Sequence, residues 1–352
     1  RGGVGVGVRE RVEMQDLQTV QQRVVTALSE IWNDRMSGSI YALYRHNARV
    51  FYGLRDQLYG REQFLGAVVA IQAMLPDLSF SVEQAAVGNT PDNETAVYVR
   101  WTLSGTHLGF GILGEPTGNK LVVTGMSISH LADGWISEQW NIIDSSTICS
   151  QLGIDRQSLL DSLAVEPPLF APSPIGDTGR VAGQAAPELF GMAGPPASSE
   201  ETAHYHLMTC WNHRSPGIVR KTHIPGSTVA IPGNSSCDAD GYIAFAYELI
   251  RIFPDLHLYI DEALSGVSGS DREEDIVAVR WTLQGMHGAD GRYGPAANRR
   301  VTIPGISEFR ISRGRILEER MIFSELDLQR HLFRYQQYTD ADALPDEEEG
   351  SR

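Results

Sequence analysis

Residues 97–144 read VYVRWTLSGTHLGFGILGEPTGNKLVVTGMSISHLADGWISEQWNIID, and residues 277–324 repeat the pattern as VAVRWTLQGMHGADGRYGPAANRRVTIPGISEFRISRGRILEERMIFS. Trp101 matches Trp281 at an offset of 180 residues (281 − 101 = 180). A constant offset means that no insertion separates the copies within this stretch. We therefore expect two copies of one domain. The same offset aligns His107 with His287, Gly125 with Gly305, and Gly134 with Gly314.

Length and composition agree with two globular domains. The chain has 352 residues, of which 42% are hydrophobic and 21% charged, as in ordinary soluble proteins. It has no apolar run long enough to span a bilayer, so we expect no membrane partner. A net charge of −15 argues against binding the phosphate backbone of nucleic acids. Three scattered cysteines are too few for a disulfide framework or a zinc site, and we expect buried thiols.

Targeting signals are not evident at the start of the sequence. The chain begins at Arg1 rather than at Met, so the true N-terminus is expected to lie further upstream. Residues 1–8 (RGGVGVGV) lack the long apolar core of a signal peptide. A cytoplasmic location is the resulting expectation.

Periodicity divides each copy into helices followed by strands. Apolar residues at three- and four-residue spacing predict a helix over residues 10–32, and a second helix runs from Gly60 to the residue before Pro76. Strict alternation then predicts antiparallel strands, with a hairpin turn at Asp133-Gly134. This order indicates an α+β layer. The expected organisation is a domain at 10–160, a Pro/Gly/Ala-rich linker at 161–200, a second domain at 201–338, and an acidic tail at 339–352.

Six short motifs follow one another in the first copy. They are Trp101-Thr102, Gly105-Thr106-His107, Pro116-Thr117-Gly118, Gly125, Asp133-Gly134-x-Ile136-x-Glu138-x-Trp140-x-x-x-Asp144 and Gln151-Leu152-Gly153. Together they resemble the SnoaL-like polyketide cyclases, in the superfamily of ketosteroid isomerase and nuclear transport factor 2. The resemblance covers most of residues 10–155 and, more loosely, about 200–335.

The resemblance implies a fold and a reaction. The fold is a cone, in which a bent antiparallel sheet is wrapped by helices around an apolar pocket. Two fused cones imply an intramolecular pseudo-dimer, and further association into homo-oligomers is compatible with it. The reaction is an intramolecular aldol ring closure, or a related lyase or isomerase step, on a small hydrophobic carbonyl compound, without cofactor or metal. Two alternatives stay open: a non-catalytic binding module for a small molecule or a protein, and epoxide hydrolysis or hydration.

Two residues are candidates for catalysis by this resemblance. Asp144 takes the place of the family's general acid/base, although an aspartate before Ser145 can also cap a final helix. His107 is expected near the pocket, where it can hydrogen-bond a substrate carbonyl or the aspartate. Alternatively, His107 is a structural residue at the end of a strand, whose ring nitrogens form hydrogen bonds with backbone groups.

Further residues are candidates for the pocket wall or its polar contacts. Because Trp101, Trp140 and Trp32 lie on presumed inward faces, they can stack on a flat ligand or simply form core. Two polar candidates follow the first helix, namely Tyr44 and His46. A reserve acid is Glu138, for which the alternative is an exposed strand residue.

The second copy departs from the pattern. Asp144 is matched by Ser324 and Trp140 by Arg320, which predicts a degenerate second domain. Its expected pocket residues are Trp281 and His287. The spacing of the histidines that crowd its start fits no metal motif, so no metal site is expected. These histidines are His204, His206, His213 and His223.

Overall fold

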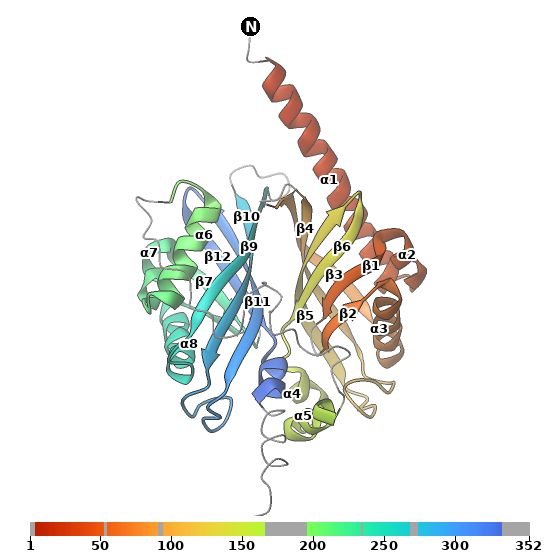
Figure 1. Ribbon diagram of the computed structural model, residues 1–352, viewed down its shortest axis with the longest axis vertical. Helices are drawn as coiled ribbons and strands as arrows, with labels where there is room; N and C mark the ends of the chain where they lie inside the picture. Colours follow the sequence, from red (N-terminus) through yellow and green to blue (C-terminus); the bar gives the residue numbers. More distant parts are fainter. Residues whose placement is uncertain are drawn as a thin grey trace, which may run out of the picture.

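The computed structural model describes residues 4–52, 55–90, 94–165, 196–233, 235–267 and 274–332. The described chain forms two domains, each with a six-stranded sheet covered by helices on one face (Figure 1). The α+β architecture of two tandem cones is therefore confirmed. Most of the predicted linker and all of the predicted acidic tail lie outside the described residues. No helix among the described residues is both long and apolar enough to cross a membrane.

The first domain begins with three helices and two strands. Its elements are α1 (Val4–Trp32), α2 (Ile40–Leu43), β1 (Tyr44–Tyr52), β2 (Arg55–Tyr59), α3 (Arg61–Met74), β3 (Ser79–Asn89), β4 (Thr95–Thr106), β5 (Lys120–Ala132), β6 (Trp135–Ile143), α4 (Ile148–Leu152) and α5 (Arg156–Val165). The strand order is β2-β1-β6-β5-β4-β3, with β1 and β6 parallel and the other neighbours antiparallel.

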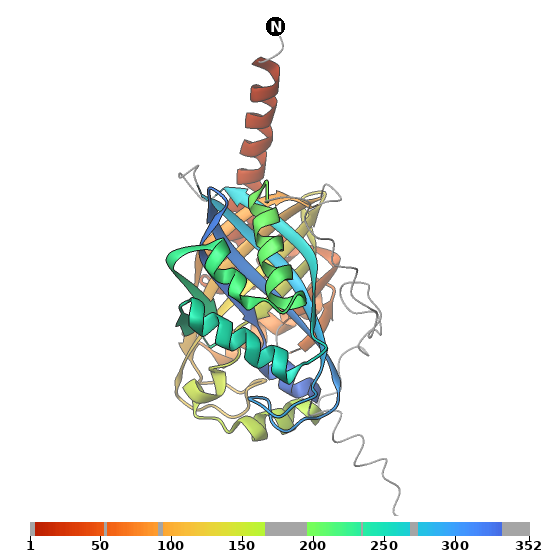
Figure 2. The same ribbon diagram turned by 90° about the vertical axis from the view of Figure 1, so that its left-hand side faces the viewer.

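The second domain repeats this order through its last strand. Its elements are α6 (Ser199–Leu207), a π-helical turn (Met208–Asn212), α7 (Val219–Thr222), β7 (His223–Ile231), β8 (Ser235–Cys237), α8 (Ala239–Ile252), β9 (His257–Val267), β10 (Asp275–Met286), β11 (Arg300–Ser312) and β12 (Arg315–Phe323). The strand order β8-β7-β12-β11-β10-β9 matches that of the first sheet. Figure 2 shows α6 and α8 lying across the face of this sheet that points away from the first domain.

Local chemistry explains the hairpins and the glycines that the two copies share. Asp133 and Gly134 have φ angles of 51° and 79°, and a tight hairpin of this kind needs positive φ at both central residues. The predicted turn is therefore confirmed. Gly125 has a different reason: a Cβ atom there would lie 2.2 Å from the ring of Trp101. The indole lies flat over this glycine on the helix-covered face of the sheet.

The two sheets pack against each other through the faces that carry no helices (Figure 1). An apolar cluster from both domains fills the interface: Ala86, Ala96, Tyr98, Met126, Ile128, Ile142, Leu264, Ile276, Ala278, Ile306 and Ile322. Polar bridges cross the same interface. The Tyr98 hydroxyl donates to Glu308 at 2.7 Å, and the Arg100 guanidinium lies 3.1 Å from the same carboxylate. The chain thus forms an intramolecular pseudo-dimer.

Candidate functional site

Asp144 lies at the junction between the two domains. It follows β6, is 6% exposed, and accepts a hydrogen bond from the backbone N–H of Gly233 at 2.8 Å. Its other carboxylate oxygen accepts from the backbone N–H and the hydroxyl of Ser146. Because Thr147 is the N-cap of α4, Asp144 does not cap that helix directly. These contacts join the end of the first sheet to a loop of the second domain.

His107 is buried at the end of β4 and holds the loop that leads to β5. Its backbone N–H donates to the Asn119 carbonyl at 2.9 Å, and its Nδ1 lies 3.3 Å from the hydroxyl of Thr117. Burial lowers the pKa of its imidazole. His287 repeats this arrangement, since its Nδ1 accepts the backbone N–H of Ala297 at 3.1 Å. The two histidines therefore play the same loop-holding part in both domains.

Trp140 and Glu138 lie on the opposite face of the sheet from Trp101. The register pairs Trp101 with Gly125 and Gly125 with Ile143, so Ile143, Asn141 and Gln139 of β6 share the face of Trp101. Trp140 instead stacks under Arg280 of the second domain, 4.0 Å from its guanidinium, and it lies between the sheets. The prediction that Trp140 shares a pocket wall with Trp101 is wrong. The sequence shows which residues alternate within one strand, but it does not show how neighbouring strands are aligned, and this alignment decides the face on which Trp140 lies.

The remaining candidates of the first domain divide between surface and core. His46 is exposed, and Glu138 forms an ion pair with Arg49. Trp32 is buried and stacks on Phe80, with ring centroids 6.1 Å apart. Tyr44 points into the cone, as described next.

A chain of uncharged hydrogen bonds lines the interior of the first cone. The indole N–H of Trp101 donates to Ser127 at 2.8 Å, and the Ser127 hydroxyl donates to Asn141 at 2.7 Å. The amide of Asn141 donates to Gln139 at 3.2 Å, and Gln139 also accepts from the Tyr44 hydroxyl at 2.8 Å. Sequence reasoning missed Ser127, Gln139 and Asn141. Their signal was polar side chains at alternate positions of strands with apolar neighbours.

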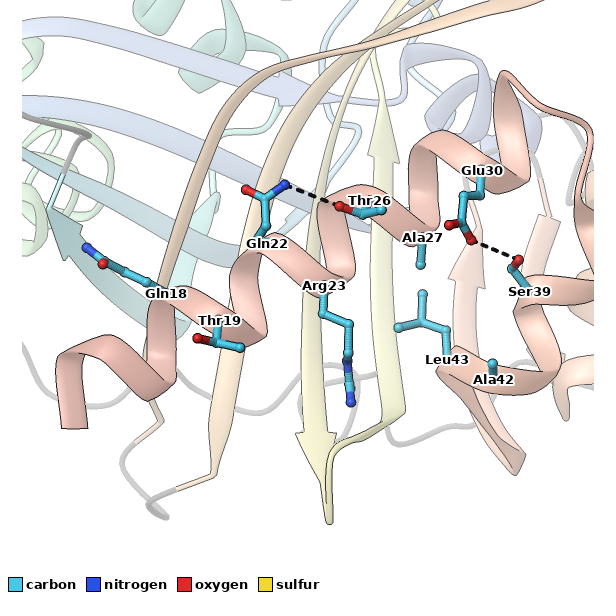
Figure 3. Close-up of a pocket in the computed structure, with 10 residues that line it drawn as sticks. All are labelled: Gln18, Thr19, Gln22, Arg23, Thr26, Ala27, Glu30, Ser39, Ala42 and Leu43. Carbon is cyan, nitrogen blue, oxygen red and sulfur yellow. Dashed lines mark hydrogen bonds between the residues drawn. The ribbon is translucent and has the colours of Figure 1, made fainter. Parts of the chain in front are cut away.

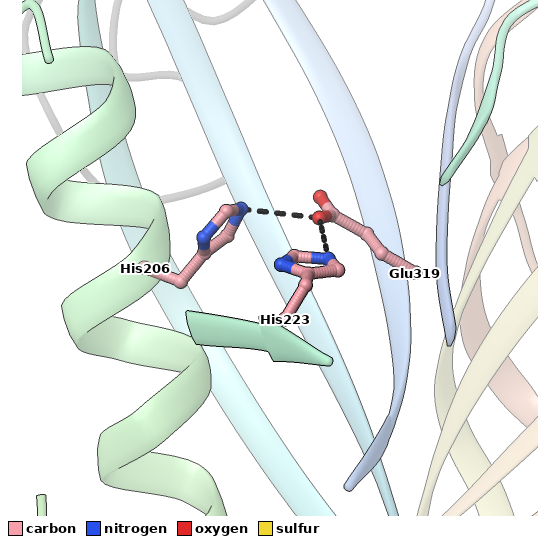
Figure 4. A group of neighbouring side chains, drawn as sticks. All are labelled: His206, His223 and Glu319. Carbon is pink, nitrogen blue, oxygen red and sulfur yellow. Dashed lines mark ion pairs between the residues drawn. The ribbon is translucent and has the colours of Figure 1, made fainter. Parts of the chain in front are cut away.

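The corresponding interior of the second cone holds a group of ionisable side chains. His206 from α6, His223 at the start of β7 and Glu319 from β12 converge with their ring nitrogens and carboxylate facing one another (Figure 4). Nε2 of His206 lies 3.1 Å and Nε2 of His223 lies 3.2 Å from Oε2 of Glu319. All three side chains are nearly or fully buried. We call these residues the His–His–Glu cluster.

Three neighbours complete the surroundings of the His–His–Glu cluster. The Tyr242 hydroxyl lies 3.3 Å from Nε2 of His206 and 3.5 Å from Oε1 of Glu319. The Thr222 oxygen lies 2.9 Å from Nδ1 of His206 and 3.2 Å from Nδ1 of His223. The thiol of Cys210 donates to Tyr242 at 3.5 Å. Every ring nitrogen of the cluster thus faces another polar atom.

Electrostatics separate the charge states within the His–His–Glu cluster. Burial alone would raise the pKa of Glu319, but the two imidazoles outweigh it and lower the carboxyl pKa to about 2. Burial lowers the pKa of His223. Burial, with Cys210 and Glu319 nearby, raises the pKa of the Tyr242 hydroxyl far above its ordinary value. The carboxylate is therefore ionised, and the phenol keeps its proton.

The first cone carries none of these ionisable groups at the matching positions. His206 and His223 match Ala27 and Tyr44 at an offset of 179 residues (206 − 27 = 179; 223 − 44 = 179). Glu319 matches Gln139 at an offset of 180 residues (319 − 139 = 180). The predicted degeneracy of the second domain rested on Ser324 and Arg320 in place of Asp144 and Trp140. In the cone interior, by contrast, the second domain holds more ionisable groups than the first.

The second-domain residues predicted from the repeat have structural contacts. Trp281 lies over Gly305 and its indole N–H donates to Ser307 at 3.0 Å, as Trp101 does in the first cone. His287 holds the loop between β10 and β11. Neither belongs to the His–His–Glu cluster, whose members sequence reasoning did not connect.

A separate cavity of about 890 Å³ lies in the first domain, along α1 and α2 (Figure 3). Its walls mix polar and apolar side chains: Gln18, Thr19, Gln22, Arg23, Thr26, Ala27, Glu30, Ser39, Ala42 and Leu43. Two hydrogen bonds within the wall tie Gln22 to Thr26 and Ser39 to Glu30. This cavity is formed by the first domain, whereas the His–His–Glu cluster belongs to the second.

Comparison with known proteins agrees with the duplicated fold. The model of the SnoaL-like polyketide cyclase family matches residues 22–152 and again residues 203–332. Among curated proteins, no match was found.

Solved structures match one domain's length of the chain at a time. TsrD from Streptomyces laurentii is 21% identical over 38% of this chain and 96% of its own, with a TM-score of 0.34. Wild-type IdmH, a putative polyketide cyclase from Streptomyces antibioticus, is 27% identical over 38% of this chain and 99% of its own, with a TM-score of 0.32. The two family matches cover most of the chain and both described domains, so this protein belongs to the SnoaL-like polyketide cyclase family.

Proposed function

We propose that this protein is an enzyme of the cyclase or isomerase type that acts on a small hydrophobic carbonyl compound, with its reacting centre in the second cone. One observation carries the proposal. The His–His–Glu cluster and Tyr242 converge inside the cone of a domain whose family is named for cyclases. The first cone offers only uncharged groups at the matching positions.

The chemistry of this class has two needs. A base must take a proton from the carbon next to the carbonyl, and a donor must hold the oxygen as negative charge develops on it. The second cone contains both kinds of group. A neutral imidazole is a proton acceptor, whereas the lowered pKa of Glu319 makes its carboxylate a weak base that holds the two rings in place. The Tyr242 hydroxyl is a donor 3.3 Å from His206. Because the phenol keeps its proton, it can donate to a substrate oxygen.

Burial of the cluster sets a condition on this reaction. His206 and Glu319 are both 0% exposed, so a substrate reaches them only when helices α6 and α8 move away from the sheet. Motions of covering elements often accompany substrate entry in enzymes with closed sites. Substrate entry is therefore expected to limit the rate.

Asp144 and His107 remain a second candidate pair for catalysis. The Asp144 carboxylate already accepts the Gly233 N–H at the domain junction, which gives it a structural role and makes the His–His–Glu cluster the better candidate. The first cone contains an uncharged hydrogen-bond network that includes Ser127 and Asn141. Because such groups can hold a ligand without transferring a proton, we assign non-catalytic ligand binding to the first cone.

The proposal is tested by hydrogen exchange at carbon. The protein is incubated in D₂O with bicyclic aromatic ketones such as 1-tetralone, and deuterium entry next to the carbonyl is followed by NMR. We expect exchange above the buffer rate, and its loss in His206→Asn. Glu318→Gln is the matched control, because Glu318 lies one position along β12 and pairs with Arg310 and Arg320 on the other face. Exchange that survives His206→Asn would contradict the proposal.

A further inference from the structure

The hydrogen-bond pattern around Thr222 fixes where the protons of the two imidazoles lie. The Thr222 hydroxyl donates to the backbone carbonyl of Ile218 at 3.1 Å, so its single proton is used. Nδ1 of His206 and Nδ1 of His223 both face the Thr222 oxygen, at 2.9 and 3.2 Å. With the hydroxyl proton on Ile218, each Nδ1 carries the hydrogen and donates it to the Thr222 oxygen. In neutral imidazoles, both Nε2 atoms then present bare lone pairs.

Both lone pairs point at the same carboxylate oxygen. Nε2 of each ring lies within 3.2 Å of Oε2 of Glu319. Neither Nε2 of His223 nor Oε2 of Glu319 makes a hydrogen bond within the described part of the chain, although both are buried. Three electron-rich atoms that face one another away from water repel unless positive charge lies between them. One extra proton on His206 would pair that ring with the carboxylate but would leave the Nε2 lone pair of His223 facing Oε2. A second proton would place two charged rings side by side, with centroids 4.9 Å apart.

A single divalent ion would satisfy all three atoms at once. The ligand atoms of His206, His223 and Glu319 lie within 4.8 Å of one another. Zinc binds imidazole nitrogen and carboxylate oxygen at about 2.0–2.2 Å, so two ligand atoms on one tetrahedral ion are ~3.4 Å apart. The observed nitrogen–oxygen distances of 3.1 and 3.2 Å are close to this spacing. Two histidines and one glutamate are also a ligand set of catalytic zinc sites.

We propose that His206, His223 and Glu319 bind one divalent transition-metal ion inside the second cone. Thr222 is then a positioning residue, because metal-binding histidines usually donate their second ring N–H to a nearby acceptor that fixes the ring. The sequence spacing of the histidines predicted no such site. Folding brings together two of them, from α6 and β7, with a carboxylate from β12 (Figure 4).

The metal site would also change the roles of the groups in the proposed reaction. A bound divalent ion would polarise a carbonyl oxygen and lower the pKa of a bound water. Because both Nε2 atoms and Oε2 of Glu319 would be its ligands, that water rather than an imidazole would be the proton acceptor. This consequence rests on the proposed function. Metal binding itself does not, because it is measured without any substrate.

Metal titration of the full chain tests the proposal. Protein treated with EDTA and dialysed is titrated with Zn²⁺ by calorimetry and with Co²⁺ by visible absorption. We expect one ion per chain and the intense Co²⁺ bands of a four- or five-coordinate site. Glu319→Gln and His206→Asn should weaken binding more than about 100-fold, and Thr222→Val about 10-fold, since loss of an outer partner typically costs 10- to 100-fold.

Controls separate this site from other ligands and from misfolding. Glu318→Gln should bind metal as the parent protein does, and circular dichroism shows whether each variant is folded. If Glu319→Gln does not fold, Thr222→Val decides, because it keeps all three ligands. Absence of stoichiometric binding by the parent protein, or equal affinity in folded Glu319→Gln, would overturn the proposal. Full ketone exchange by metal-free protein would remove the ion's part in the reaction while leaving the proposed reaction in place.

Discussion

Gly125→Ala should destabilise the first domain through one defined clash. The new methyl group would lie 2.2 Å from the ring of Trp101, whereas non-bonded carbon atoms prefer about 3.5–4.0 Å. The indole must therefore shift by ~1.5 Å to restore that distance. Such a shift breaks its 2.8 Å hydrogen bond to Ser127, which is itself bonded to Asn141. The substitution thus disturbs the whole uncharged network of the first cone.

The magnitude follows from two contributions. Overpacking a dense core costs about 1–3 kcal/mol, and a buried hydrogen bond contributes about 1 kcal/mol net. We expect the free energy of unfolding to fall by about 2–4 kcal/mol in urea denaturation followed by circular dichroism. Gly66→Ala is the matched control. It lies in α3 with no atom near the added methyl group, so it should stabilise by about 0.5–1 kcal/mol.

A double-mutant cycle isolates the clash from other effects. In a Trp101→Leu background the indole is absent, so Gly125→Ala should cost less than about 1 kcal/mol. Equal costs in both backgrounds, or a change below about 0.5 kcal/mol in the parent protein, would refute the packing argument.

Three further predictions concern single groups. Glu308→Ala strands Arg100 between the sheets and should lower the free energy of unfolding by about 3–5 kcal/mol, with part of the loss recovered by adding Arg100→Met. Asp144→Ala removes the acceptor of the Gly233 N–H and should cost about 1–3 kcal/mol in the same assay, while Asp144→Asn should cost less. Hydrogen bonds from the side chain and the backbone N–H of Thr106 lower the pKa of Asp77 in the folded protein. The ionised carboxylate therefore contributes its full stabilisation above its unfolded pKa, near 3.9, and this stabilisation is lost as the pH falls through the lower pKa of the folded state. The stability difference between the parent protein and Asp77→Asn should therefore shrink on acid titration, and a constant difference would contradict this.

Much of the fold could be predicted from the sequence because its determinants are local or repeated. The constant offset between Trp101 and Trp281 predicted two copies of one domain, and strict alternation predicted the strands. Asp133-Gly134 predicted a tight hairpin because few residues tolerate positive φ at both positions. Each of these inferences needs only neighbouring residues or a comparison of the chain with itself.

The candidate site could not be predicted in the same way, because it depends on register and on distant contacts. Trp140 was placed beside Trp101 by alternation, but the pairing of Gly125 with Ile143 puts it on the other face. The metal-binding candidates lie 17 and 96 residues apart along the chain (223 − 206 = 17; 319 − 223 = 96). No spacing rule connects such residues. Glu319 carried a weak signal, since Met321 and Phe323, its neighbours on the inward face of β12, are apolar.

One comparison tests the central claim that the chemistry lies in the second cone. Glu319→Gln and Asp144→Asn each replace one carboxylate by its amide, and ketone deuterium exchange is measured for both in the full chain under identical conditions. We expect Glu319→Gln to reduce exchange to the buffer rate and Asp144→Asn to keep most of it. Loss of exchange in Asp144→Asn, with full exchange in Glu319→Gln, would place the reacting centre in the first domain instead.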